Sequence, residues 1–245
     1  MLYPEIIVKM ISVCIATYNG ERFIKEQLDS ILCQIGPNDE VIVSDDHSTD
    51  GTRRVIESLK DKRVAFLVNE HVPGVTGNFE NALLHARGDC IFLSDQDDVW
   101  MPNKVAVMTK WLESYPYVVS DCLVTDMLLN VVSETRYTLQ SGITKNKYLA
   151  FLKSTPYQGS CAAFRREVLS KAIPFPKNIQ SHDRWIGFVA AFYFSVGFCP
   201  EKLMYYRRHS QTVSTATEGH SPNSILSRIR NRFLYAKALF GIRNR

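Results

Sequence analysis

The sequence predicts an α/β protein with a doubly wound, mostly parallel central sheet. Short apolar runs rich in β-branched residues recur through the first half of the chain, and their near-continuous hydrophobicity suits strands that are covered on both faces. Stretches with apolar residues at helical spacing separate these runs, so strand and helix alternate roughly every 25 to 30 residues. This alternation is typical of βαβ units, whose right-handed crossovers produce an open sheet with helices on both faces.

The elements of the first half follow this alternation. Strands are predicted at Ile11–Ala16, Glu40–Ser44, Val64–Val68 and Cys90–Leu93, and helices over Phe23–Leu32, Val55–Leu59 and Phe79–Leu84. Polar residues follow the first, second and fourth of these strands. Open α/β sheets bind ligands at the carboxyl ends of their strands, near the point where the strand order reverses, so a ligand site is predicted there.

The second half is less regular, and we place a soft boundary near residue 100 within one continuous core. Pro102 predicts the first turn of a helix over Asn103–Ser114. The apolar run Trp185–Phe198 is about 14 residues long, short of the roughly 20 that span a bilayer, and indicates a core helix running into a strand. Further strands are predicted at Tyr117–Val119, Leu123–Asp126, Leu128–Val132, Gln158–Arg165 and Leu203–Arg207.

Composition limits the class of protein. The 245 residues are 45% hydrophobic and 22% charged, as in ordinary globular proteins, and the net charge of +4 gives no reason to expect a nucleic-acid partner. The six cysteines form no CxxC pair and several lie in apolar runs, so buried, reduced thiols are expected. The amino terminus has no signal-peptide pattern. We therefore expect a cytoplasmic protein.

Carboxylates are concentrated in the stretch FLSDQDDVW, where Asp95, Asp97 and Asp98 follow the apolar run Cys90–Leu93. Like charges this close repel one another unless a cation is shared between them. Mg²⁺ and Mn²⁺ bind to one or two carboxylates together with substrate phosphates, whereas a closed zinc site needs histidine or cysteine ligands. The cluster therefore predicts a Mn²⁺ or Mg²⁺ site, with a solvated turn that caps the next helix as the alternative.

A second pair of carboxylates, Asp45 and Asp46, follows the second strand. Helix capping accounts for Ser48–Asp50 just beyond it, but not for two carboxylates at the strand end. We interpret the pair as acceptors for ligand N–H or hydroxyl groups, such as those of a nucleobase or a ribose. The phosphate loops GxGxxG and GxxxxGK[ST] and the zinc motif HExxH are absent from the sequence.

Four segments in order, ATYNGERF, VIVSDDHSTDGT, GVTGNFENAL and FLSDQDDVWMPNK, resemble those of the family 2 inverting glycosyltransferases with a GT-A fold. The resemblance extends to YQGSCAAFRREVL, SHDRWIGFVA and YYRRHSQTVS, and it points to the rhamnosyltransferase-like branch that builds bacterial O-antigen or capsule glycans. It implies a single domain over residues 1–218. Within this domain, residues 10–100 form a nucleotide-sugar-binding half and residues 101–218 an acceptor-binding half, and residues 219–245 are a tail.

The resemblance assigns donor binding to the loops after the strands. It places Tyr18 and Asp46 near the pyrimidine base and Asp97 at the ribose. Asp98 coordinates the metal that bridges the diphosphate, and His209 matches a late histidine that reaches the metal or the diphosphate. The other residues predicted to bind the nucleotide-sugar are Thr17, Asn19, Asp45, Asn78 and Asp95.

The resemblance assigns the general base to Asp183, in the stretch SHDRW. A carboxylate that takes the acceptor proton on the face opposite the leaving group inverts the anomeric carbon, as in inverting glycosidases. A metal stabilises the departing diphosphate as a Lewis acid. The alternative for His182–Asp183 is the capped start of a helix near Trp185. Four residues are predicted to bind the acceptor: Gly159, Ser160, His182 and Trp185.

The expected protein is a metal-dependent inverting glycosyltransferase that moves one sugar from dTDP-rhamnose or a UDP-sugar to a glycan acceptor, expected to be lipid-linked. The QxxRW motif of processive members is missing, which favours single-sugar transfer, and His47 stands where many relatives have glycine. One alternative is a sugar nucleotidyltransferase, although the segment after the first strand lacks the basic glycine-rich loop that holds a triphosphate. The other is a nucleotide-sugar or glycan binding module without catalysis.

The tail, residues 219–245, contains no acidic residue. A helix starting near Ser224 would place apolar side chains on one face and basic ones on its two flanks. The apolar set is Ile225, Leu226, Ile229, Phe233, Ala236 and Phe240, and the basic set is Arg228, Arg230, Arg232 and Lys237. This amphipathic pattern predicts a helix in the interface of the inner face of the cell membrane, attached through anionic lipid. A terminal helix packed on the domain has the same periodicity and is the alternative.

Overall fold

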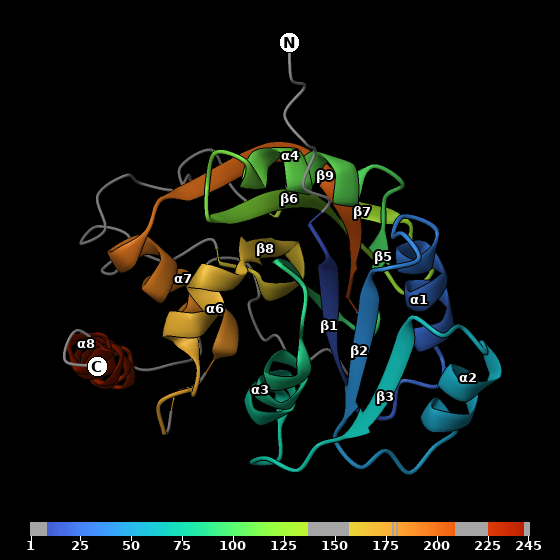
Figure 1. The fold of residues 1–245 in the computed structure, drawn as a ribbon, viewed down its shortest axis with the longest axis horizontal. Coiled ribbons are helices and arrows are strands. Elements are labelled where there is room, and N and C mark those ends of the chain that lie inside the picture. The colour runs from blue at the N-terminus through green and yellow to red at the C-terminus, as the bar shows by residue number, and fades with distance from the viewer. Residues whose placement is uncertain (1–8, 137–156, 178, 180, 209–224, 243–245) are drawn as a thin grey trace.

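The computed structural model describes residues 9–136, 157–177, 179, 181–208 and 225–242, without the side chains of residues 225–229. Within these residues, one sheet of nine strands runs through the molecule in the order β3-β2-β1-β4-β8-β6-β9-β5, with β7 paired to β6. Helices cover both sides of the sheet (Figure 1). The predicted α/β class is therefore confirmed.

The parallel half of the sheet consists of β1 (Ile11–Thr17), β2 (Glu40–Asp45), β3 (Val64–Val68) and β4 (Cys90–Asp95). The order reverses at β1, which lies between β2 and β4. Three helices connect these strands. They are α1 (Ile24–Leu32), α2 (Thr52–Ser58) and α3 (Val75–His85), of which α3 covers one face of the parallel half and α1 and α2 the other (Figure 1).

The mixed half of the sheet begins beyond β4. Strand β8 (Ala162–Arg165) pairs antiparallel with both β4 and β6 (Tyr117–Thr125). Strand β9 (Val196–Arg207) runs parallel to β6 and carries β5 (Val99–Trp100) on its other side, while β7 (Val131–Ser133) pairs with β6 as a hairpin. The sheet is thus parallel in its first half and mixed in its second.

Two strands of the mixed half are longer than predicted. The predicted strands Tyr117–Val119 and Leu123–Asp126 merge into the single strand β6, which ends at Thr125, because the residues between them pair with β9 through shifts in register. Strand β9 begins at Val196, so the strand predicted at the end of the run Trp185–Phe198 and the predicted strand Leu203–Arg207 are one strand, for the same reason. Polar residues interrupt the apolar pattern of both strands without ending their pairing.

The helices of the mixed half complete the fold. Helix α4 (Lys104–Leu112) lies over β6 and β9, and α6 (Arg166–Ala172) packs against α7 (His182–Tyr193) (Figure 1). The predicted strand Gln158–Arg165 divides into a short 3₁₀ helix, η2 (Gly159–Cys161), and β8. Buried hydrophobic side chains from both halves form one continuous cluster, as expected. All six cysteines are unpaired, and all but Cys33 are buried.

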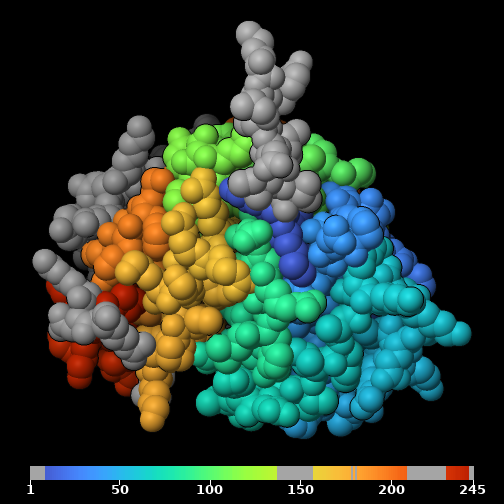
Figure 2. Space-filling model, in the orientation of Figure 1, coloured from blue at the N-terminus to red at the C-terminus, as the bar shows by residue number. Residues whose placement is uncertain are grey.

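The C-terminal helix α8 (Ile225–Ile242) starts close to the predicted position. It lies at the edge of the molecule beside α7, far from the parallel half (Figures 1 and 2). Across the described part of the chain, no helix is both long and apolar enough to cross a membrane.

One face of α8 packs on the domain, but it is not the predicted apolar face. Tyr235 and Leu239 are buried, and the Tyr235 ring meets Phe188 at 5.2 Å between centroids. Phe233 and Phe240, from the predicted apolar face, are 70% and 69% exposed. The alternative of a packed terminal helix therefore holds for one face of α8, while aromatic side chains of another face point to solvent.

Candidate active site

The parallel half brings the ends of its strands to one edge of the sheet. Thr17, at the end of β1, pairs with Asp45 of β2, and the preceding residue Ala16 pairs with Asp95 of β4. Because parallel strands share one direction, the loops that follow these three strands begin side by side. The predicted gathering of polar loops is therefore present.

The loop after β1 is held by hydrogen bonds to the loop after β2. Asn19, in the left-handed region with φ of 48°, donates its N–H to Ser48 Oγ at 2.8 Å. Its Oδ1 accepts the Thr49 N–H at 2.9 Å. Asparagine tolerates this backbone conformation better than most residues. Between these anchors and the end of β1, the Tyr18 side chain is 56% exposed.

Asp45 and Asp46 both organise loops. Asp45 is buried and accepts the Ser48 N–H at 2.8 Å, which closes a turn. Asp46 accepts hydrogen bonds from Asn69 Nδ2 and from the Gly74 N–H, both at 2.7 Å, and so ties the loop before α3 to the end of β2. Asp45 thus closes a turn within the loop and does not cap α2, and ligand contacts by this pair stay a prediction.

Asn78, on α3, is 2% exposed and lies against the end of β1. Its Nδ2 donates to the Thr17 carbonyl at 3.0 Å, whereas its Oδ1 is buried without a hydrogen-bond partner among the described residues. A buried acceptor left unpaired costs about 1–3 kcal/mol. A ligand that donates a hydrogen bond would remove this cost, which agrees with the predicted role of Asn78.

The acidic turn between β4 and β5 contains Asp95, Asp97 and Asp98. Asp98 is 1% exposed and its Oδ1 accepts the Arg207 N–H at 3.0 Å, while its Oδ2 has no hydrogen-bond partner in the described part of the chain. The Arg207 guanidinium does not neutralise Asp98, because it pairs with Glu26 at 2.7 Å. Burial and the charges of Asp97 and Asp95 raise the pKa of Asp98 well above its usual value. A bound cation would offset the repulsion between these carboxylates and the cost of burying the Asp98 charge.

Asp95 links the acidic turn to the mixed half. Burial, followed by the charges of Asp97 and Asp183, raises the pKa of Asp95 to about 7. The Ser160 side chain opposes this shift by a hydrogen bond to the Asp95 carboxylate. The carboxylates of β4 and α7 therefore lie close enough to interact, although they are far apart in the sequence.

Lys104, at the start of α4, places a cation in the floor of the site. It is fully buried, and its ammonium donates to the Ser160 carbonyl at 2.6 Å and lies 4.5 Å from the centroid of the Trp100 ring. Burial lowers the pKa of Lys104, and Asp98 and Asp95 oppose that shift. The lysine thus connects the acidic turn with η2.

Helix α7 brings the predicted general base to η2. Asp183 lies in the first turn of α7 and accepts a hydrogen bond from the Ser181 hydroxyl. A Cβ atom built on Gly159 would lie 3.0 Å from His182 Nε2 and 3.3 Å from Asp183 Cβ. This close approach leaves little room for a side chain at position 159, and it places the predicted acceptor loop directly against the predicted base.

His182 and Trp185 were also predicted to bind the acceptor, and their surroundings differ. His182 stacks on Phe79 at 3.9 Å between centroids, its Nε2 has no hydrogen-bond partner among the described residues, and burial lowers its pKa. Trp185 is 1% exposed and donates its indole N–H to the Ala172 carbonyl at 2.8 Å. Trp185 is therefore held in the core against α6, and its contact with an acceptor stays a prediction. His209 lies outside the described residues.

Three residues of the site were not predicted from the sequence: Gln96, Lys104 and Arg207. Gln96 and Lys104 belong to the stretch FLSDQDDVWMPNK, so the motif itself was the available signal. Arg207 lies in the stretch YYRRHSQTVS, but its contact with Asp98 uses the backbone N–H and depends on the position of β9, so no side-chain pattern indicated it.

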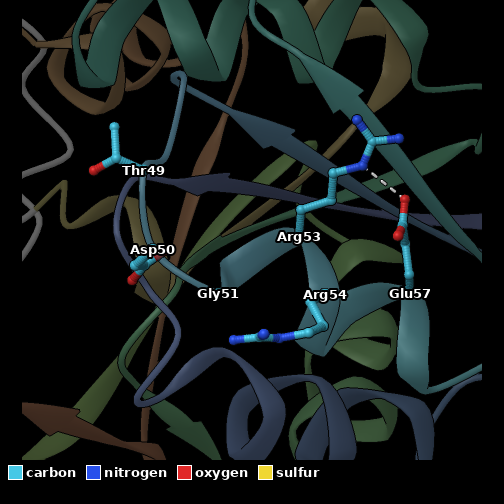
Figure 3. Close-up of a pocket in the computed structure, with 6 residues that line it drawn as sticks. All are labelled: Thr49, Asp50, Gly51, Arg53, Arg54 and Glu57. Carbon is cyan, nitrogen blue, oxygen red and sulfur yellow. Dashed lines mark hydrogen bonds and ion pairs between the residues drawn. The ribbon is translucent and has the colours of Figure 1, made fainter.

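A surface hollow of about 530 Å³ lies at the start of α2, beyond the loop that follows β2 (Figure 3). Its cations are offset by carboxylates, since Arg53 pairs with Glu57 at 2.7 Å and Arg54 pairs with Glu21 at 3.3 Å. The charges on its lining are thus engaged within the protein, and the acidic turn and Asp183 do not belong to that lining.

The fold and the site agree with one class of protein. The model of the family "Glycosyl transferase family 2" matches residues 12–172, which include the parallel half, the acidic turn, η2 and β8. The chain belongs to this family.

Named relatives in this family include bacterial glucosyltransferases. The chain is 36% identical over 96 residues to the UDP-Glc:α-D-GlcNAc-diphosphoundecaprenol β-1,3-glucosyltransferase WfgD of Escherichia coli, with 39% of this chain and 38% of that protein covered. It is 33% identical over 118 residues to the GalNAc(5)-diNAcBac-PP-undecaprenol β-1,3-glucosyltransferase of Campylobacter jejuni, with 46% and 38% covered. The matched region thus spans well under half the length of these relatives.

Solved structures share the fold. That of S. aureus TarS 1-349 in complex with UDP-GlcNAc superposes with a TM-score of 0.71 at 19% identity, over 92% of this chain and 66% of that one. Glucosyl-3-phosphoglycerate synthase from Mycobacterium tuberculosis, in complex with Mn²⁺, UDP and phosphoglyceric acid, gives a TM-score of 0.59 at 20% identity, over 96% and 78%. The predicted GT-A fold is therefore confirmed.

Proposed function

We propose that the protein is a metal-dependent inverting glycosyltransferase that moves one sugar from a pyrimidine nucleotide-sugar to a hydroxyl of a glycan acceptor. The observation that carries this proposal is the proximity of two sets of carboxylates, one formed by the acidic turn and the other by Asp183 alone. The acidic turn follows β4, and Asp183 at the start of α7 lies close enough to raise the pKa of Asp95. The acidic turn suits the metal that accompanies the leaving diphosphate, and Asp183 suits the removal of a proton from the attacking hydroxyl.

The residues present fit a divalent cation. Asp98 keeps one buried carboxylate oxygen without a hydrogen-bond partner among the described residues, as a metal ligand must. The described residues contain no cluster of three or more His, Cys, Asp or Glu side chains that would enclose a metal by themselves. A site with so few protein ligands suits Mn²⁺ or Mg²⁺. These ions take one or two carboxylates and complete their shells with phosphate oxygens and water. His209 stays a predicted further ligand. When bound, the ion neutralises charge on the departing diphosphate.

The residues of the chain supply the remaining chemistry. Asp183 accepts the proton of the acceptor hydroxyl while that oxygen forms a bond to the anomeric carbon. The bond from the anomeric carbon to the diphosphate oxygen breaks on the opposite face, and the nucleoside diphosphate leaves. Gly159 and Ser160 border the acceptor beside Asp183, and His182, neutral because burial lowers its pKa, donates or accepts a hydrogen bond there.

The donor is assigned to the loops of the parallel half. The exposed Tyr18 ring offers a stacking surface for a base, and Asn78 Oδ1 is a buried acceptor that suits the N–H of a pyrimidine. UDP-sugars and dTDP-rhamnose both meet this requirement. The Escherichia coli relative named for UDP-Glc favours a UDP-sugar. The polyprenyl diphosphates in the names of both glucosyltransferase relatives favour a lipid-linked acceptor and a role in surface polysaccharide synthesis.

A thermal-shift titration tests the donor and the metal together. UDP and dTDP, with and without Mn²⁺, should stabilise the wild-type chain, and the shift should be larger with the metal. Asp98→Asn should lose the metal-dependent part, whereas Asp29→Asn, a substitution of an exposed carboxylate on α1, should keep it. Stabilisation by purine nucleotides alone would overturn the proposal.

Donor hydrolysis and transfer assays separate the competing functions. A glycosyltransferase releases UDP or dTDP from its donor. A binding module would be stabilised by the donor without releasing a product, and a nucleotidyltransferase would need a nucleoside triphosphate and a sugar phosphate instead.

The lipid-linked acceptor gives a reason for membrane contact through α8. The exposed rings of Phe233 and Phe240 lie on a helix with exposed Arg230 and Lys237, and the tail from residue 219 has no acidic side chain. Basic residues near an anionic surface contribute on the order of 1 kcal/mol each. The double variant Phe233→Ser/Phe240→Ser should unfold like the wild type but sediment less with anionic liposomes in low salt. Equal sedimentation of both proteins would exclude this face as the membrane anchor.

A further inference from the structure

Gln96 lies in the acidic turn, but its side chain forms hydrogen bonds with the end of β1 and the loop that follows it. Its Oε1 accepts hydrogen bonds from the Thr17 hydroxyl at 2.6 Å and from the Tyr18 N–H at 2.9 Å. Its Nε2 donates to the Tyr18 carbonyl at 3.1 Å. One amide therefore engages both backbone polar groups of Tyr18, across a separation of 78 residues in the sequence.

The backbone of the loop is shaped to accept this amide. A Cβ atom built on Gly20 would lie only 2.4 Å from Gln96 Oε1 and 2.8 Å from Thr17 Oγ1, closer than real Cβ contacts. Glycine at position 20 is thus required for the glutamine to reach the loop. The Gly20 N–H itself donates to Thr52 Oγ1 at 2.8 Å, so the loop is anchored on both sides of Tyr18.

The hydrogen bonds between Gln96 and Tyr18 hold the backbone of Tyr18 and leave its side chain largely exposed. The side chain is 56% exposed while its backbone is fixed from both sides. A rigid backbone under an exposed aromatic ring lowers the entropy cost of stacking, which is worth about 1–3 kcal/mol per base in proteins that bind single strands.

We propose that Gln96 is a positioning residue that sets the Tyr18 ring at a fixed distance from Asp97 and Asp98. The nucleoside of the donor would then meet the stacking ring and the diphosphate site in one rigid unit. This inference rests on the proposed function, because it assumes that a nucleoside diphosphate binds at this edge. It predicts that loss of the glutamine amide weakens recognition of the base and leaves recognition of the diphosphate intact.

Calorimetric titration with two probes tests this separation. The first probe is UDP or dTDP, whichever the wild type binds more tightly, and the second is inorganic pyrophosphate, which has no base; both are used with Mn²⁺. Gln96→Ala should weaken nucleotide binding about tenfold or more, the equivalent of about 1.4 kcal/mol, and should change pyrophosphate binding less than about twofold.

Two further variants separate positioning from a general loss of structure. Gln34→Ala is the matched control, since this glutamine also bridges two backbone groups, the Ser30 carbonyl at 2.7 Å and the Val105 N–H at 3.2 Å, away from the strand ends. It should leave both affinities unchanged. Tyr18→Ala removes only an exposed ring and should reproduce the selective loss of nucleotide binding even if Gln96→Ala folds poorly.

The possible results lead to different conclusions. Equal nucleotide binding by the wild type and Gln96→Ala would overturn the positioning role alone, and so would a parallel loss of nucleotide and pyrophosphate binding in this variant. A wild-type chain that binds pyrophosphate but neither nucleotide would overturn the proposed function as well.

Discussion

The two halves of the sheet hold their site residues by different kinds of contact. In the parallel half, neighbouring loops are joined by hydrogen bonds between groups near the surface, such as Asn19 with Ser48 and Asp46 with Gly74. In the mixed half, site residues rest on buried side chains. The Lys104 ammonium supports the Ser160 carbonyl, and Phe79 packs under His182.

This difference indicates which substitutions should affect ligand binding alone and which should affect stability as well. Exposed loops bonded to one another can lose one contact and keep the core intact, so substitutions there should act mainly on ligand binding. A buried cation beside buried carboxylates leaves an uncompensated charge when one partner is removed. Substitutions in the floor of the mixed half should therefore change stability as well as activity.

Lys104→Met should have the largest effect on stability. It leaves the Ser160 carbonyl unpaired and removes the buried cation beside Asp98 and Asp95, so we expect a loss of about 3–5 kcal/mol in the free energy of unfolding. Denaturation with urea in metal-free buffer measures it. Lys110→Met, at an exposed position of the same helix, is the matched control, and equal stability of the two variants would contradict the role of Lys104 in the floor of the site.

Asp183→Asn should lower turnover strongly and leave the fold intact. An amide cannot take the acceptor proton, so turnover should fall by about 10²-fold or more, the usual scale of general-base catalysis. Nucleotide affinity should stay at the wild-type value, because the donor loops belong to the parallel half. Steady-state transfer and calorimetry measure the two quantities, with Asp29→Asn as the control, and wild-type turnover would remove Asp183 from the mechanism.

Tyr235→Ala and Phe233→Ala compare the two faces of α8. Tyr235 is 4% exposed against Phe188, so its truncation should lower the free energy of unfolding by about 2 kcal/mol. Phe233 is 70% exposed, and its truncation should change stability by less than about 0.5 kcal/mol. Chemical denaturation measures both. A larger effect at Phe233 would show that the predicted apolar face, and not that of Tyr235, packs on the domain.

Asp95→Asn should give an effect on stability that depends on pH. Because the pKa of Asp95 is raised to about 7 in the folded protein, the folded state keeps a proton that the unfolded chain has released above about pH 4. The free energy of unfolding therefore falls as pH rises through this window, and the loss is complete above about 7. Asparagine does not titrate, so the metal-free variant should be more stable than the wild type at pH 8, by up to about 4 kcal/mol because the folded pKa lies about three above the unfolded one, and similar near pH 4.

Asp61→Asn is the control of opposite sign. Its hydrogen bonds to Arg63 lower the pKa of Asp61 to about 2, so the stability that it contributes is present above its unfolded pKa and is lost only as pH falls towards 2. Between pH 5 and 8 this variant should therefore differ from the wild type by a constant amount. Thermal unfolding across this range, in the presence of a chelator, distinguishes the two slopes. A slope shared by both variants would mean that Asp95 is not the titrating group.

The sequence alone determined the strands of the parallel half. The apolar runs of β1, β2 and β4 are buried along almost their whole length, so hydrophobicity marks them without reference to any partner, and the edge strand β3 has the same kind of run although it is only partly buried. The strand Val64–Val68 has the predicted bounds, and β1, β2 and β4 differ from the prediction by at most two residues. The acidic turn was found for the same reason, because it directly follows such a run.

Only the tertiary structure decided the lengths of β6 and β9, the supporting roles of Gln96 and Lys104, and the packed face of α8. Each depends on a partner far away in the chain: Gln96 reaches Tyr18 across 78 residues and Lys104 reaches Ser160 across 56. A hydrophobic pattern records whether a side chain is buried, but not against which group. Phe233 and Tyr235 are both aromatic residues of one helix, and the contact of Tyr235 with Phe188 is what separates the packed face from the exposed one.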